Sequence, residues 1–192
     1  MRRFAFFVLL CAPAMAALAQ RAPDVAQRAP EVARPTGQER AWLNGCVNAG
    51  SGQPPRADFG RCGWRITLSC QGYVSESLLD ARMPQVQGRL AEPRGCAPVE
   101  TALWQELLDR WQQEATIFAP PAAAEPMRRA HRAFIAFRDT ACAVEGAVAR
   151  GTLAQDNQAS CRLEATALRA LEMKRLRDEL FAEVAARPGA AP

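Results

Sequence analysis

The segment HRAFIAFRDTAC, residues 131–142, gathers side chains that could do chemistry: the only histidine of the chain, an arginine followed by an aspartate, and a cysteine. His131 could act as a general base, but such a base needs a nucleophile or a polarised water, and usually a carboxylate that orients it. The sequence contains no Gly-x-Ser-x-Gly elbow and no second histidine. We therefore expect no catalytic residue and no enzyme activity, and we interpret His131 as a surface or partly packed side chain.

The compartment of the protein decides the state of its cysteines, and the N-terminus indicates export. Two arginines precede an apolar run and a small-residue region, which is the order of a secretory signal peptide over residues 1–19. A lipoprotein alternative exists through Cys11, but the large Leu10 before it is unfavourable. No apolar stretch reaches the about 20 residues that a transmembrane helix needs. We therefore expect a periplasmic or secreted protein.

The six cysteines that follow the signal are expected to form disulfides. They are Cys46, Cys62, Cys70, Cys96, Cys142 and Cys161. An even number in an exported chain favours disulfides over free thiols. No pair has the CxxC or CxxCH spacing of zinc sites and c-type haem attachment. We therefore predict neither a metal site nor a cofactor.

Arg138 allows two interpretations. Together with Asp139 it could bind an anionic ligand or a carboxylate of a partner protein. Alternatively, it reaches across a helix bundle to Glu106 or Asp109, while Asp139 faces solvent. We favour the second interpretation because a buried arginine needs a partner.

Tryptophan provides the other candidate contact, because this side chain anchors many protein interfaces. Trp104 and Trp111 lie on an apolar helical stripe and are expected in the core. Trp64 lies between Gly63 and Arg65 in a segment bounded by cysteines. Trp64 and Arg138 are therefore the candidate interaction residues.

Apolar periodicity predicts an all-α fold, a disulfide-stapled helix bundle with a C-terminal antiparallel helical hairpin. A helix from Pro98 to Pro120 carries a stripe at steps of four and three: Trp104, Leu108, Trp111, Ala115 and Phe118. A second helix, from Pro126 to Gly151, is expected to pack through Phe134, Phe137, Ala141, Val144 and Val148. A third begins at a capping box at Thr152 and runs to about Arg187, with the pairs Lys174/Asp178 and Arg175/Glu179 on its exposed side.

The N-terminal half is less regular. Residues 20–36 contain a repeated Pro- and Ala-rich heptad and are interpreted as a tether, so the domain is predicted over residues 37–187, with a disordered tail at 188–192. Thr36 and Glu39 match a capping box and predict a helix over about 37–49. A short helix is expected after Asp58, and residues 71–94 are left open between a hairpin around Tyr73 and another helix.

The cysteine positions predict one disulfide from geometry. Cys142 and Cys161 are equidistant from the Gly151-Thr152 junction, so antiparallel helices leaving that turn bring them to the same height. The other four most simply pair as Cys46–Cys62 and Cys70–Cys96. The rival pairing joins Cys46 to Cys70 and Cys62 to Cys96.

The net charge of the chain limits the classes of binding partner that we expect. The full chain carries a formal net charge of +4, and losing the two arginines of the signal leaves it near neutral. No basic field steers nucleic acid and no polybasic cluster holds a membrane surface. A protein partner is the remaining expectation, and the oligomeric state is left open.

The string Ala133–Cys142, which contains Phe134 and a Phe-Arg-Asp-x-x-Cys sequence, resembles the lysozyme-inhibitor LprI-like N-terminal-domain family. The residues that carry the resemblance are Phe134, Phe137, Arg138, Asp139, Cys142, Gly151, Cys161, Thr166 and Arg169. A weaker similarity includes the remaining cysteines and Trp104. Gln105 departs from the family, which usually has Asp there. The resemblance implies an exported, disulfide-bonded helical domain named for a member that inhibits lysozyme.

Two functions follow as hypotheses. The first is an exported binding protein that protects peptidoglycan by occluding a lysozyme. The alternative is a periplasmic structural or scaffolding protein without inhibitory activity, which an exposed polar segment at 174–183 would favour. Lysozyme or another envelope protein is the expected partner.

Overall fold

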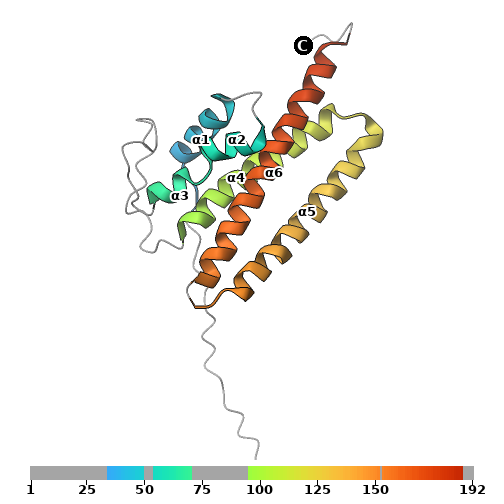
Figure 1. The fold of residues 1–192 in the computed structure, drawn as a ribbon. Coiled ribbons are helices and arrows are strands. Elements are labelled where there is room, and N and C mark those ends of the chain that lie inside the picture. Colours follow the sequence, from blue (N-terminus) through green and yellow to red (C-terminus); the bar gives the residue numbers. More distant parts are fainter. Residues whose placement is uncertain (1–33, 50–53, 71–94, 152, 188–192) are drawn as a thin grey trace, which may run out of the picture. The chain divides into compact units, whose positions relative to one another are not determined.

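The computed structural model describes residues 34–49, 54–70, 95–151 and 153–187, and all regular structure in these ranges is helical, as predicted. The helices are α1 (Gly37–Ala49), α2 (Pro55–Cys62), α3 (Arg65–Cys70), α4 (Cys96–Phe118), α5 (Pro121–Val148) and α6 (Leu153–Ala185). α6 packs mainly on α4 and then on α5, with which it forms the predicted hairpin (Figure 1). α3 contacts α4, and α2 contacts α1 and α6.

α4 is the centre of the core. Trp104, Leu108 and Trp111 are at most 1% exposed, so the predicted stripe is the buried face of this helix. Burying each large apolar side chain contributes about 1.5–3 kcal/mol, which makes this stripe the main source of cohesion. At the end of α4, the ring of Phe118 lies 5.3 Å from that of Phe181, which ties the last turns of α6 to the bundle.

α1 begins at the capping box predicted from the sequence. The backbone N–H of Glu39 donates to Thr36 Oγ1 at 3.2 Å, and the N–H of Thr36 donates to Glu39 Oε2 at 2.5 Å. These reciprocal bonds satisfy amides that a helix start leaves free. Leu43 and Val47 then enter the core from α1.

The short helix expected after Asp58 is two helices. α2 ends at Cys62 and α3 begins at Arg65, because Trp64 has a left-handed backbone conformation with φ 66°. A bulky side chain rarely adopts this conformation, so the surrounding contacts must hold it.

α5 starts earlier than predicted. Its first residue is Pro121, and Pro126 lies inside the helix rather than at its start. Pro121 at the first position has the fixed φ that a helix start needs, and its missing N–H leaves no bond unmade. The prediction failed because it treated the Pro120-Pro121 pair only as a terminator.

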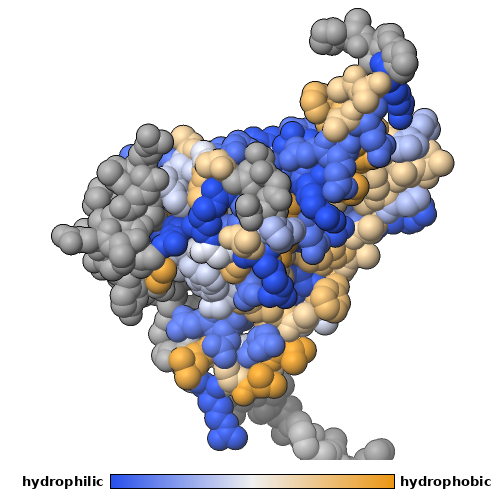
Figure 2. Space-filling model, turned by 45° about the horizontal axis from the view of Figure 1, so that its top comes forward, coloured by the Kyte–Doolittle hydropathy of each residue, from blue (hydrophilic) through white to orange (hydrophobic). Residues whose placement is uncertain are grey.

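The packed face expected for α5 was right for Phe134 but wrong for three of its other residues. Phe137, Val144 and Val148 are 70%, 57% and 73% exposed, while Phe134 and Ile135 pack against the core and Cys142 is buried. The space-filling view shows apolar surface along the α5 side of the molecule (Figure 2). The helix has apolar residues on two sides, and the side that carries Arg138 and Cys142 is the one that packs.

α6 contradicts a second surface prediction. Lys174 is only 8% exposed, although the ammonium group reaches Asp178 Oδ2 at 2.7 Å. Its aliphatic stem covers apolar surface while its charged end finds a carboxylate. Arg175 and Glu179 are exposed, as predicted, with 3.8 Å between their charged groups.

The three predicted disulfides are those of the structure. They are Cys46–Cys62, Cys70–Cys96 and Cys142–Cys161, with Cα separations of 5.9, 5.7 and 5.4 Å. The rival pairing of the first four cysteines is therefore wrong. Gly146 lets α5 and α6 approach closely beside the third bridge, since a Cβ there would lie 3.1 Å from the Ala154 carbonyl oxygen.

Other predictions fall outside the described residues. They are the signal peptide, residues 20–33 of the tether, the alternatives for 71–94, the capping residue Thr152 and the tail at 188–192. In the ranges that are described, no helix is both long and apolar enough to cross a membrane.

Candidate functional site

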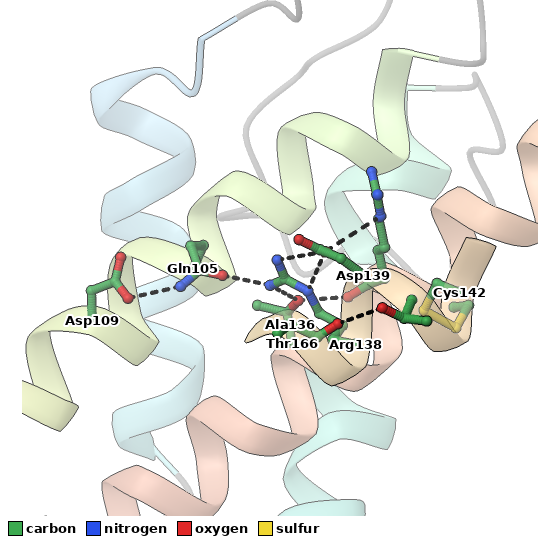
Figure 3. A network of polar contacts seen from close by, with 10 residues as sticks. Gln105, Asp109, Ala136, Arg138, Asp139, Cys142 and Thr166 are labelled. Atoms are coloured by element: carbon green, nitrogen blue, oxygen red, sulfur yellow. Dashed lines mark hydrogen bonds and ion pairs between the residues drawn. A yellow bond between two sulfur atoms is a disulfide. The ribbon is translucent and has the colours of Figure 1, made fainter. Parts of the chain in front are cut away.

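Arg138 joins three helices through its guanidinium group (Figure 3). Nη1 donates to Gln105 Oε1 of α4 at 2.6 Å and to Thr166 Oγ1 of α6 at 3.0 Å. Nε and Nη2 donate to Asp139 Oδ1 at 3.1 and 3.0 Å. The side chain is 11% exposed, so most of its donors are satisfied inside the protein.

The prediction of a structural role for Arg138 named the wrong partners. Glu106 instead forms an ion pair with Arg40 at 2.7 Å. Asp109 accepts a hydrogen bond from Gln105 Nε2 at 2.7 Å. Gln105 therefore bridges Arg138 and Asp109, because its side-chain oxygen accepts from the arginine and its side-chain nitrogen donates to the aspartate.

Asp139 does not simply face solvent. It holds Arg138 and lies 3.7 Å from Nε of Arg162 on α6, with about half of its side chain exposed. The single negative charge of Asp139 balances only one of the two positive charges of Arg138 and Arg162. Because Arg162 is 42% exposed, that charge is accessible from solvent.

A groove of about 340 Å³ opens beside these arginines. It is lined by Pro98, Thr101, Ala102, Gln105, Arg138, Gln155, Gln158, Ala159 and Arg162. The apolar surface of α4 and α6 is thus combined with amide and guanidinium groups, a mixture that suits a carboxylate or an amide on an otherwise apolar segment. Its volume lies near the lower end for ligand sites, which fits a side chain or short segment of a partner better than a large molecule.

The local fold explains how Arg138 and Thr166 come to meet. Gly151, with φ 66°, makes the turn between α5 and α6, and the Cys142–Cys161 bridge fixes the register of the two helices. Arg138 lies one turn before Cys142 on α5, and Thr166 follows Cys161 on α6. The disulfide therefore holds Thr166, which is fully buried, within reach of the guanidinium.

His131 is partly packed, as predicted, with a side chain 19% exposed. Its Nε2 lies 3.3 Å from Asp109 Oδ1, so the histidine has a carboxylate neighbour of the kind that orients a general base. Neither side chain lines the groove. The pair therefore links α5 to α4 outside the groove and is connected to Arg138 through Gln105.

Trp64, the other candidate, lies elsewhere, at the turn between α2 and α3, and is partly exposed. Glu100 of α4 supports this turn from inside, because its carboxyl group accepts the backbone N–H of Thr67 at 2.7 Å. The same carboxyl group accepts the indole N–H of Trp104 at 3.3 Å. Burial raises the pKa of Glu100, and hydrogen bonds from Thr67, Trp104 and Trp64 oppose that rise.

Sequence reasoning missed the buried role of Glu100 because a glutamate near a helix start is usually interpreted as a dipole or capping residue. Its position was a usable signal. Glu100 lies four residues before Trp104 and so extends the apolar stripe of α4 by one turn.

The remaining residues of the predicted pattern divide between packing and exposure. Phe134 packs against the core and receives the guanidinium of Arg169, 5.7 Å from its ring centre. Arg169 also pairs with Glu172 at 3.1 Å. Phe137 alone points away from these contacts, being mostly exposed. Where the structure is described, no cluster of three His, Cys, Asp or Glu side chains could hold a metal ion.

Comparison with protein-family models shows which family part of this chain resembles. The family model described as "Lysozyme inhibitor LprI" matches residues 83–173, a range that contains α4, α5 and the larger part of α6. Comparisons with curated proteins and with solved structures gave no significant match. The matched range includes the Arg138 network and the groove, whereas Trp64 lies before it. Over these residues, the chain is similar to the LprI lysozyme-inhibitor family.

Proposed function

We propose that this chain is an exported binding protein that inhibits a lysozyme by covering its substrate cleft. The observation that carries the proposal is the family match, because its range coincides with the helices that build the Arg138 network and the groove. Residues 1–19 act as the signal peptide and residues 37–187 as the functional domain in this proposal.

The disulfides support action outside the cytoplasm. Each of the six cysteines in the described helices is paired with another, and one pair closes the α5–α6 hairpin that holds Arg138. Such bonds persist in oxidising compartments, where lysozymes attack the cell wall, and are rare in the cytosol.

Within the domain, we assign the lysozyme contact to the groove with Arg162 at its edge. Glycoside hydrolases of the lysozyme type use a pair of carboxylates at the scissile bond. An exposed guanidinium beside an apolar groove offers a charge complementary to such a cleft, and Arg162 is half-exposed. Arg138 positions Asp139 beside Arg162 and is itself mostly buried.

Inhibition of peptidoglycan lysis tests the proposal. The oxidised exported chain is titrated against lysozymes of several classes, with a reduced and alkylated sample alongside. We expect stoichiometric inhibition of at least one class that disappears on reduction, because the Cys142–Cys161 bridge positions the site. No inhibition of any class at large excess would contradict it.

Single substitutions test which surface of the domain contacts the lysozyme. Arg162→Gln is expected to weaken inhibition, whereas Arg175→Gln, a matched change at an exposed arginine of the same helix, is expected to leave it unchanged. Loss of inhibition in Trp64→Ala with no change in Arg162→Gln would move the contact to the α2–α3 turn.

The scaffolding alternative keeps a support. It was favoured by an exposed polar segment at 174–183, and Arg175, Glu179 and Glu183 are exposed there, although Lys174 is buried. A structural role in the envelope would still be indicated by a chain that binds envelope proteins without inhibiting lysis.

A further inference from the structure

The outward face of α5 is uncharged along most of its length. Nine exposed residues make up this face, which we call the α5 stripe: Ala130, Ala133, Ala136, Phe137, Thr140, Ala143, Val144, Ala147 and Val148. Thr140 needs no water for its hydroxyl, which donates to the Ala136 carbonyl at 2.9 Å. A solvent-facing side of a helix normally carries charged or polar residues, so a face of this kind indicates a contact surface.

The spacing of the α5 stripe indicates what kind of element would cover it. Six of its members recur at alternating steps of three and four: Ala130, Ala133, Phe137, Thr140, Val144 and Ala147. This is the heptad period of a helix that packs lengthwise on another helix. The opposite side of α5, with Arg138 and Cys142, already packs on α4 and α6. The bundle itself therefore does not use the stripe.

We propose that the α5 stripe binds the α5 stripe of a second copy of this chain, with the two helices antiparallel. A two-fold axis at the level of the Arg138-Asp139 peptide bond places Phe137 opposite Thr140 of the second copy. The same register places Ala133 opposite Val144. Phe137 and Val144 then each meet a smaller side chain, the arrangement that lets facing helices interdigitate. The contact is self-complementary, as a two-fold interface requires.

Charge is compatible with this pairing. Arg132 and Glu145 are exposed beside the stripe and not within it, while Arg129 and Arg150 lie toward its two ends. At those ends the charges stay in water, where salt screens them over about 8 Å at physiological ionic strength. Antiparallel helices also bring opposite ends of their dipoles together.

The length of the stripe sets the expected strength. From Ala130 to Val148 it spans about 27 Å at a rise of about 1.5 Å per residue. One helix pair of that length falls at or below the low end of stable interfaces, about 1,200 Å² in total. We therefore expect a reversible dimer with a dissociation constant in the micromolar range.

Sedimentation velocity of the oxidised exported chain, from about 1 to about 200 µM, brackets that range. We expect the mass to rise from monomer to dimer with concentration. Phe137→Glu is expected to remain monomeric throughout. Ile117→Glu is the matched control, because Ile117 of α4 is 70% exposed, like Phe137, and lies outside the stripe. It is expected to dimerise like the unsubstituted chain.

A pair of substitutions tests the register. Ala133→Glu and Val144→Arg should each weaken the dimer, and the double variant should restore it, because the new carboxylate of one copy then meets the new guanidinium of the other. A parallel pairing would bring like charges together and leave the double variant monomeric, which would overturn the antiparallel arrangement. A chain that stays monomeric at all concentrations would overturn the proposal. If Phe137→Glu then also abolished lysozyme inhibition, the α5 stripe would be a contact surface for the lysozyme instead.

Discussion

Glu100→Gln tests whether one buried carboxyl group makes the stability of the fold depend on pH. The carboxyl group of Glu100 is fully buried, where it holds the start of α3 through the backbone N–H of Thr67 and contacts the indole of Trp104. Its pKa is raised from the ordinary 4.5, chiefly by burial. Glutamine keeps an acceptor oxygen and the length of the side chain, but it cannot ionise.

The direction of the effect follows from proton linkage. Because the pKa of Glu100 is higher in the folded chain, the folded state keeps a proton over a pH range in which the unfolded state has lost it. The stabilisation is therefore fully present below the unfolded pKa and is lost as pH rises through the folded pKa. Between those two values, the free energy of unfolding falls by about 1.4 kcal/mol for each pH unit.

Urea unfolding of the oxidised chain at a series of pH values, from the ordinary carboxyl pKa upward, measures this slope. We expect the stability of Glu100→Gln relative to the unsubstituted chain to increase with pH in this window and then become constant. Glu106→Gln is the control. Its half-exposed carboxylate has a pKa lowered by the hydrogen bond from Arg40, so its contribution is lost only as pH falls below the ordinary value. Parallel pH profiles for Glu100→Gln and the unsubstituted chain would refute the reasoning.

Three further substitutions test individual contacts. Arg138→Met should lower the free energy of unfolding by about 2–3 kcal/mol, because charge-assisted hydrogen bonds to Gln105 and Thr166 are lost; an unchanged urea midpoint would show that the network is not stabilising. Replacing Cys142 and Cys161 together by serine opens a loop with a sequence separation of 19 and should lower stability by about 3 kcal/mol, and a thermal midpoint equal to that of the unsubstituted chain would argue against this staple. Thr36→Ala removes the cap of α1 and should lower stability by about 1 kcal/mol, whereas a gain in stability would contradict the capping geometry.

The disulfides and the core stripe could be predicted because each rests on local spacing. The Trp104 stripe is a period that only one face of a helix can satisfy, and it became the buried face of α4. Cys142 and Cys161 lie symmetrically about a helix turn, so their pairing needed only the helical rise.

The outward face of α5 could not be predicted in the same way. This helix has apolar residues on two sides, and periodicity alone does not show which side packs. The buried side is marked by Cys142 and by the polar Arg138, whose acceptors Gln105 and Thr166 come from other helices. Those partners are set by tertiary register, which the spacing of α5 does not contain.

Lys174 and Glu100 show the same limit for charged residues. Both are buried although their types suggest exposure, and each is held by a specific partner at short distance. The groove beside Arg162 likewise could not be predicted from the sequence, because its lining residues come from α4, α5 and α6.

Titration calorimetry of the oxidised chain into a lysozyme, with and without a peptidoglycan-like oligosaccharide filling the cleft, tests the central claim most directly. The account predicts binding to the free enzyme and a large loss of affinity when the oligosaccharide occupies the cleft. Equal affinity in both titrations, or no binding to any lysozyme class, would contradict it.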